Sequence, residues 1–227
     1  ILGKRPLLTE VRIKPAISGR VTQGTFEAHL NGFRFLTKKQ DTVDFTYSNI
    51  KHAFFQPCGA EMVAILHFRL KSPVLVGKKK VTDLQIYAEP GTQVEDKVDE
   101  FKHQILSYKY LLDLGRRARD DEDEWEAEEE EKRQRILLNK NFENFVNGVA
   151  SEVIIIACKS LVDHLNQYKD KIEFDIPYRE LGFYGVPFKS NVMLYPTLNC
   201  LISITENPPF ILELDQIEWA HFERIAV

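Results

Sequence analysis

The sequence predicts a mainly β fold with an α-helical segment, in which two copies of one β-unit flank the helices. Three observations lead to this fold class. The first 90 residues alternate apolar and polar side chains between turn signals, whereas residues from about 98 to 168 follow helical spacing. After residue 172 the alternation returns, and its apolar positions match those of the first segment at a constant offset of 167 residues.

The N-terminal segment predicts seven or eight short strands. Residues 26–35 alternate around Asn31-Gly32, a pair that favours the two positive φ angles of a tight hairpin. Further strands are predicted over residues 42–47, 50–56, 62–70, 74–76 and 81–88. Strands at this spacing are typical of a small antiparallel barrel or sandwich.

Helical periodicity begins after Pro90-Gly91. One helix is predicted from Val98 to about Leu114, and another begins near Glu124. Asn147-Gly148 predicts a break in the second helix, with Ser151 capping a continuation to about Tyr168. The second helix has an apolar stripe that either packs in the core, which we expect, or forms an external binding face: Leu138, Phe142, Phe145, Val146 and Val149.

The repeat keeps its register across several turns without an insertion. At the offset of 167, nine apolar positions match: Phe26, Ala28, Phe33, Phe35, Phe45, Tyr47, Ile50, Ala53 and Phe55 meet Met193, Tyr195, Cys200, Ile202, Leu212, Leu214, Ile217, Ala220 and Phe222. We therefore expect a first domain with its closing and linking helices over residues 1–170. Residues 171–227 are expected to form the N-terminal part of a second, incomplete domain.

One short stretch carries the net charge of the chain. Asp120 to Glu131 contains ten carboxylates in twelve positions. Without it and the six basic residues beside it, the chain's 34 acidic and 30 basic residues become 24 of each. A neutral body with a local acidic band favours a basic macromolecular partner, and a solvated helix start or disordered linker is the alternative. The candidate binding residues are Asp120, Asp121, Glu122, Asp123, Glu124, Trp125, Glu126, Glu128, Glu129, Glu130 and Glu131.

Trp125 is the one aromatic residue inside this run. It is either an anchor for the partner or a side chain packed on its own helix. A weak basic patch is the other charged feature, formed by Arg12, Lys14, Arg20, Lys78, Lys79 and Lys80. This patch could meet phosphate groups, and a solvated hairpin tip is the alternative.

The sequence contains no motif for catalysis or metal binding. The six histidines lack ligand spacing, and Cys58, Cys158 and Cys200 are widely separated, so neither a zinc site nor a disulfide framework is expected. Gly77-Lys78-Lys79 lacks the earlier glycine and the following Ser or Thr of a phosphate-binding loop. With no signal segment and no long apolar run, we expect a non-enzymatic protein without cofactor or metal in a reducing compartment.

Two long motifs carry a family resemblance. One reads FEAHLNGFRF from Phe26 and continues as NIKHAFFQPC from Asn49. The other reads IPYRELGFYGVP from Ile176 and is followed by Pro208-Pro209-Phe210 and by HFER from His221. Together they resemble the middle domain of the large subunit of the FACT histone chaperone, over about residues 5–90 and 172–225. The helical region between them agrees only in character.

The resemblance implies tandem pleckstrin-homology-like (PH-like) domains, each a seven-stranded barrel closed by a C-terminal helix. It implies a nuclear, chromatin-associated histone chaperone module that binds core histones, with the central tetramer pair favoured. That role belongs to nucleosome disassembly and reassembly in transcription and DNA replication. The other FACT subunit would be a partner through the full-length protein, DNA would be bound only indirectly or weakly, and no membrane is expected. Glu206, Pro208 and Pro209 then join the acidic run as candidate histone-binding residues.

The sequence departs from the family in two places. From the sequence we expect the second domain to lack its later strands and closing helix, and the segment from Val98 to Gln167 to be longer than the family's usual linker. Two other functions also stay open. PH-like folds host phosphoinositide and other anionic-ligand modules, which would use the basic patch. An architectural scaffold that docks another subunit would leave the acidic run as a spacer.

Overall fold

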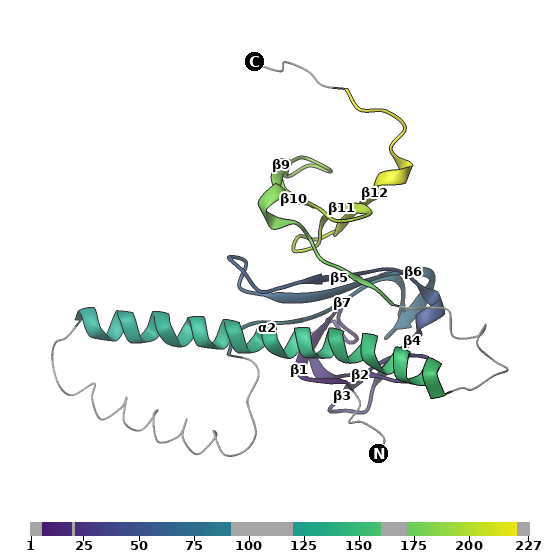
Figure 1. Ribbon diagram of the computed structural model, residues 1–227, viewed down its shortest axis with the longest axis horizontal. Coiled ribbons are helices and arrows are strands. Elements are labelled where there is room, and N and C mark those ends of the chain that lie inside the picture. Colours follow the sequence, from purple (N-terminus) through teal and green to yellow (C-terminus); the bar gives the residue numbers. More distant parts are fainter. Residues whose placement is uncertain (1–5, 20, 92–119, 160–171, 222–227) are drawn as a thin grey trace.

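The computed structural model describes residues 6–19, 21–91, 120–159 and 172–221, and within the helix it describes side chains from 127 to 149. Two sheets and one long helix make up this part of the chain (Figure 1). The larger sheet has eight strands and is curled, and the smaller has four. The architecture confirms the predicted mainly β fold with a second, smaller copy. The predicted helix from Val98 to Leu114 lies outside the described residues.

The larger sheet has the strand order β4-β3-β2-β1-β7-β6-β5-β8. Its strands are β1 (Leu7–Lys14), β2 (Thr22–Ala28), β3 (Gly32–Thr37), β4 (Thr42–Thr46), β5 (Ile50–Gln56), β6 (Ala64–Val76), β7 (Lys79–Ala88) and β8 (Phe174–Asp175). All neighbours are antiparallel except β5 and β8, which are parallel. The sheet curls so that β4 and β6 meet across the core, where the rings of Phe45 and Phe68 are 5.1 Å apart.

Aromatic side chains fill the inside of this sheet. Phe26 and Phe68 are fully buried, and the ring of Phe26 lies 5.0 Å from Phe33 and 5.8 Å from Phe68. Every second residue of β2 and β3 points into the core, because side chains alternate along a strand. Phe26, Ala28, Phe33 and Phe35 of the predicted alternation are therefore inside, whereas Leu30 lies in the loop and is 69% exposed.

The hairpin between β2 and β3 is present, but its predicted turn is wrong. The loop is centred on Leu30 and Asn31, since the His29 amide donates to the Gly32 carbonyl over 2.8 Å. Neither Asn31 nor Gly32 has a positive φ. Gly32 is needed for a different reason: a Cβ there would overlap the carbonyl oxygen of Phe45 on β4.

The strands predicted at 62–70 and 74–76 are one strand. β6 runs through both, and a bulge between Arg69 and Val74 absorbs the residues that interrupt the pattern. Met62 lies before this strand, in a turn where its φ is 51°.

Helix α2 (Asp120–Lys159) closes the curled sheet. Leu138, Phe142, Phe145 and Val149 are buried among the sheet residues, and Val146 packs against them, which confirms the predicted core stripe. The predicted break at Asn147-Gly148 is wrong, because α2 continues to Lys159. The absence of a side chain at Gly148 lets the helix approach Pro6, whose Cγ would lie 3.0 Å from a Cβ there.

The smaller sheet has the order β12-β11-β10-β9. Its strands are β9 (Phe183–Gly185), β10 (Val192–Pro196), β11 (Cys200–Ser203) and β12 (Phe210–Glu213), with 3-10 turns η2 (Arg179–Leu181) and η3 (Leu214–Gln216). The offset of 167 carries the first copy's 3-10 turn η1 (Tyr47–Asn49) onto η3, and carries β2, β3 and β4 onto β10, β11 and β12 to within a few residues. The predicted repeat is therefore confirmed in element order.

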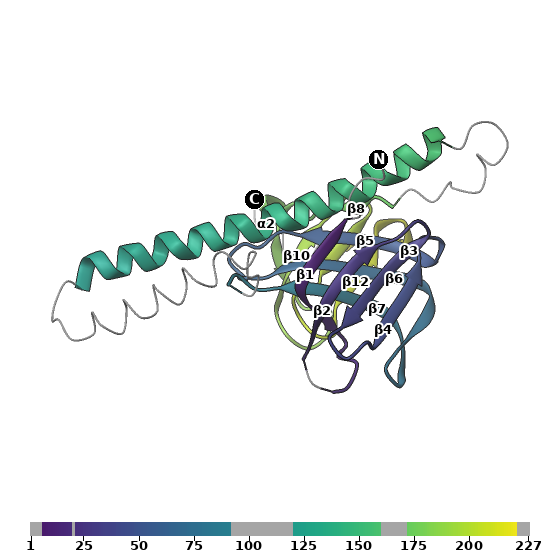
Figure 2. The same cartoon turned by 90° about the horizontal axis from the view of Figure 1, so that it is seen from below.

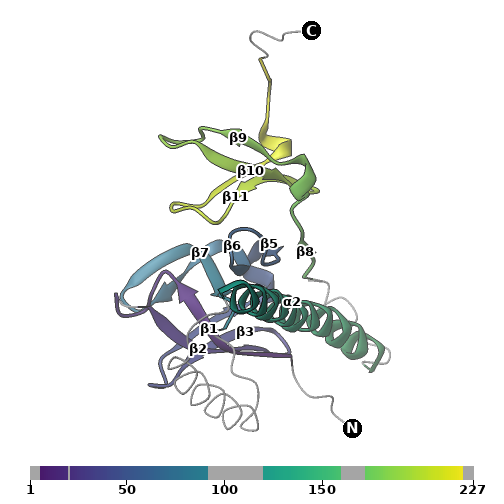
Figure 3. The same cartoon turned by 90° about the vertical axis from the view of Figure 1, so that its left-hand side faces the viewer.

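One detail of the repeat differs. In the first copy Glu27 pairs with Arg34, and in the second copy Tyr195 pairs with Ile202. Each residue of the second pair lies 168 positions after its counterpart, one more than the offset of 167 found in the sequence. A shift of one residue moves a strand's side chains to the other face of the sheet. Ile202 therefore points out of its own unit, toward the first sheet, and Figure 3 shows the smaller sheet stacked on the outside of β5, β6 and β7.

Candidate functional site

The acidic run lies on the free end of α2. Figure 2 shows this end of the helix extending past the strands. Glu128 pairs with Lys132 over 2.9 Å and Glu129 with Arg133 over 2.8 Å, as the i,i+4 spacing predicts. The hydrogen bond from Lys132 lowers the pKa of Glu128. Side chains of residues 120–126, including Trp125, lie outside those described, so their role stays a prediction.

The middle of α2 is fixed to the body at one turn. The Cys58 amide donates to Asn139 Oδ1 over 2.7 Å, and Asn139 Nδ2 donates back to the Cys58 carbonyl over 3.0 Å. These paired bonds, together with buried Phe142, set the position of the whole helix. The acidic run is thus carried on a helix with a defined direction.

The same turn holds the second unit. Arg179 of η2 donates to the Pro57 carbonyl and lies 3.3 Å from Glu61 Oε2. Tyr195 of β10 donates to Glu61 Oε1 over 3.0 Å. The segment 57–61 therefore contacts both α2 and the second unit.

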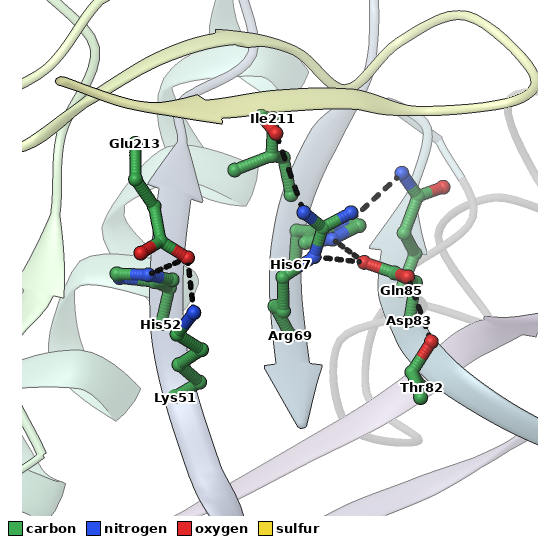
Figure 4. Close-up of polar contacts among 9 residues, drawn as sticks. All are labelled: Lys51, His52, His67, Arg69, Thr82, Asp83, Gln85, Ile211 and Glu213. Atoms are coloured by element: carbon green, nitrogen blue, oxygen red, sulfur yellow. Dashed lines mark hydrogen bonds and ion pairs between the residues drawn. The ribbon is translucent and has the colours of Figure 1, made fainter. Parts of the chain in front are cut away.

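A polar network joins the outer faces of the two sheets (Figure 4). Gln85 Nε2 donates to the Ile204 carbonyl over 2.6 Å and to His67 Nδ1 over 3.1 Å. Arg69 Nη1 donates to the Ile211 carbonyl over 3.3 Å. Because His67 Nδ1 accepts, its proton is on Nε2, which faces Asp83 Oδ1 over 3.2 Å.

The ionisable groups of this network are stabilised by contacts within the first sheet and between the two sheets. Burial lowers the pKa of His67, against the opposing effect of Asp83, so the ring is neutral. Burial opposes ionisation of Asp83, but hydrogen bonds from His67 and Arg69 outweigh it and lower the pKa of the carboxyl to about 2. On β12, the Glu213 carboxylate forms an ion pair with Lys51 of β5 and lies 3.1 Å from His52 Nε2. The contacts therefore fix the second unit on the first.

A cavity of about 580 Å³ lies where the first sheet, α2 and the second unit meet. We call it the junction groove. Its lining residues are Lys14, Glu61, Met62, Val63, Ile65, Gln85, Tyr87, Glu89, Pro90, Glu131, Gln134 and Thr205. Glu131 is the last residue of the acidic run, and Thr205 precedes Glu206 in the turn between β11 and β12. The structure thus brings one end of the acidic run and the start of the Glu206–Pro209 turn to one groove.

The rest of that turn faces outward. Glu206 and Pro208 are exposed and Pro209 is partly exposed, with a cis peptide between Asn207 and Pro208. Sequence analysis missed the groove residues Glu61, Met62 and Tyr87. Pairing of β6 with β7 brings these three residues together, and α2 and the second unit complete the groove, contacts that a local sequence pattern does not show. The nearest signal was Arg179, which lies inside the second family-like motif and pairs with Glu61.

The basic patch is not gathered into a pocket. Arg12 pairs with Glu89 over 2.9 Å, and Lys14 lines the junction groove beside carboxylates. Lys78, Lys79 and Lys80 lie exposed at the turn between β6 and β7, and Arg20 lies outside the described residues. This geometry disfavours a phosphate pocket.

Within the described ranges, no three His, Cys, Asp or Glu side chains are placed to hold a metal ion. Cys58 and Cys200 are free and buried, and burial raises the pKa of both thiols, that of Cys200 to about 11. Such thiols are weak nucleophiles at neutral pH. None of the described helices has a segment long and apolar enough to span a membrane.

The seven antiparallel strands β1 to β7 curl into a sheet that α2 closes. The four strands of the smaller sheet repeat the order β4-β3-β2-β1, and together these features define a tandem PH-like module. Residues 6–149 match the family model "FACT complex subunit SPT16 PH-like domain". Residues 184–227 match "Histone chaperone Rttp106-like, middle domain". The chain therefore belongs to the SPT16 family of FACT complex subunits, which confirms the resemblance found in its motifs.

Curated relatives carry the same family name. The chain is 39% identical over 222 residues to "FACT complex subunit spt-16" of Caenorhabditis briggsae, covering 98% of this chain and 18% of the relative. It is 38% identical over 225 residues to "FACT complex subunit SPT16" of Oryza sativa subsp. japonica, covering 96% and 19%. The protein of that name from Dictyostelium discoideum is 40% identical over 226 residues, covering 98% and 18%. The chain thus spans 18% to 19% of the length of these relatives.

Proposed function

We propose that this chain is a non-enzymatic histone-binding module of the large FACT subunit, acting in the nucleus on chromatin. Core histones would be its partners, with the central tetramer pair favoured. Its binding surface would combine the acidic run with the Glu206–Pro209 turn. The division into a first unit over 1–170 and a second over 171–227 belongs to this proposal. The other FACT subunit would be reached through the full-length protein.

The observation that carries the proposal is the placement of the acidic run. Glu128 and Glu131 are exposed on a helix that is anchored by Phe142 and extends past the sheet. Exposed carboxylates in a row attract a strongly basic partner and compete with DNA phosphates for it. Many weak charge contacts also allow fast, salt-sensitive exchange, which suits the release and redeposition of histones. The match of residues 184–227 to a histone chaperone family model supports histones as the partner.

The experiment measures histone binding in moderate salt by the full chain and by a variant with all ten acids of the run replaced by Ser or Gln. We expect affinity to fall at least about tenfold, equivalent to about 1.4 kcal/mol, with a weaker salt dependence. Unchanged affinity would remove the run from the mechanism. Co-sedimentation with anionic vesicles tests the phosphoinositide alternative in parallel.

A smaller pair of variants controls for net charge. One replaces Glu128, Glu129, Glu130 and Glu131 by Gln. The other replaces four exposed acids elsewhere with their amides: Asp41, Glu143, Glu180 and Asp215. Both change net charge equally, so a loss confined to the first variant supports placement over bulk charge. Equal losses of histone affinity would show that the net charge of the chain, acting at long range, accounts for the effect of the acidic run.

A further inference from the structure

We propose that the junction groove binds an extended segment of the basic partner in which Lys or Arg residues flank an apolar side chain. This inference rests on the proposed function. The proposed function names a basic partner and an acidic surface. The groove adds a place for an apolar contact, which neither the acidic run nor the family name locates.

The floor of the groove is suited to an apolar side chain. Met62 and Val63 line it from the turn before β6, with Ile65 of β6 and Tyr87 of β7 beside them. All but Ile65 are partly exposed, so apolar surface is open to a partner. A volume of about 580 Å³ lies within the usual range of ligand pockets, about 300–1,000 Å³. Burial of apolar area here would add affinity that does not depend on salt.

The charges of the groove select the residues that flank this side chain. Three carboxylates line it, those of Glu61, Glu89 and Glu131, against the single ammonium group of Lys14. Arg12 pairs with Glu89 and Arg179 with Glu61. The groove itself is therefore close to neutral. Net negative charge begins at Glu131 and continues along α2, because the ten acids of the run outnumber the basic residues beside it, even with Glu128 paired with Lys132 and Glu129 with Arg133. An occupant would place its apolar residue on the floor and its cations along the helix.

The test uses the full chain and a short synthetic peptide in which Arg and Lys flank a single Leu, with binding followed by fluorescence anisotropy. Glu131→Lys places a cation at the groove, and Glu143→Lys makes the same charge change at an exposed position of α2 that does not line it. We expect E131K to weaken peptide binding about tenfold and E143K by less than about twofold. Replacing the peptide's Leu with Ser should weaken binding to the parent chain about tenfold as well. If E131K then binds the Leu and Ser peptides equally, the cation and the Leu act at one site, the groove.

The outcomes separate the groove from the proposed function. Equal weakening by E131K and E143K, or indifference to the Leu, would overturn the groove as the site. If whole histones bind but the peptide does not, the proposed function stands and the groove proposal fails. If the peptide binds with the expected pattern but histones do not, the groove binds basic segments and the proposed function fails. Binding of neither overturns both.

Discussion

The guanidinium group of Arg179 occupies the space in which a Cβ of residue 59 would lie. Gly59 therefore keeps open the position from which Arg179 donates to the Pro57 carbonyl and pairs with Glu61. The two residues are 120 positions apart in the sequence. Each lies within or next to one of the two motifs that identify the family, so part of what these motifs encode is the contact between the two units.

Gly59→Ala should destabilise the chain by displacing Arg179. The added methyl group overlaps the end of a flexible side chain, so the main effect is loss of its bonds to Pro57 and Glu61. We expect a decrease of about 1–3 kcal/mol in the free energy of unfolding, measured with urea. Arg179→Ala should cost a similar amount. The double variant should be no worse than R179A alone, and additive losses would show that the methyl group acts elsewhere.

Gln85→Leu should loosen the interface between the sheets. It removes the donor to the Ile204 carbonyl and to His67 Nδ1 while keeping a side chain of similar size. An unsatisfied buried acceptor costs about 1–3 kcal/mol. Hydrogen exchange should therefore accelerate in β10 and β11 more than in β2 and β3. Equal acceleration in both hairpins would mean that the variant unfolds the chain globally.

Asp83 gives the chain a defined response to acid. Its pKa is about 2 in the folded protein, against an ordinary value of 3.8, so the unfolded chain binds the proton first as pH falls. The stability that Asp83 contributes is therefore complete above pH 3.8 and is lost as pH falls toward 2. Asp83→Asn should be less stable than the parent chain at neutral pH, and the difference should shrink over that window in urea titrations. A difference that stays constant down to pH 2 would show that the charge of Asp83 is not what stabilises the fold.

Strand positions were predictable because the alternation of apolar side chains is local. Phe26 and Ala28 alternate with Glu27 and His29 in the sequence, and this is enough to place β2 and its inward face. The repeat likewise predicted the second sheet. The hairpin turn could not be predicted, because Gly32 is required by the approach of β4, a contact that depends on the third strand.

The faces of the second unit were harder to assign. Cys200 and Ile202 match Phe33 and Phe35 at the offset of 167, yet the hairpin is shifted by one residue and they face the first sheet. Both faces of β11 carry apolar residues, because one face packs on the first unit. The alternation of apolar residues alone therefore does not show which face points toward the first unit. The junction groove could not be predicted for a different reason: it forms where the turn before β6, the strand β7, the helix α2 and the second unit meet, and local patterns do not show which of these elements come together. The acidic run, by contrast, was evident from charge alone, and its histone-binding role is still a proposal.

The anchoring of α2 connects the stability of the first sheet to the direction of the acidic run. Phe142 is fully buried against Phe55 of β5, with ring centroids 6.3 Å apart. Phe142→Ala removes this contact and leaves a cavity, so we expect a loss of about 3–5 kcal/mol in the free energy of unfolding. Ile136→Ala on the same helix is the matched control, because Ile136 is 66% exposed and its loss should change stability by less than about 0.5 kcal/mol. If the anchored helix presents the acids to the partner, F142A should also weaken histone binding, while I136A should not. Binding is measured under conditions where circular dichroism shows that the sheet of F142A is still folded. Full histone affinity in a folded F142A variant would show that the acidic run acts without a fixed direction.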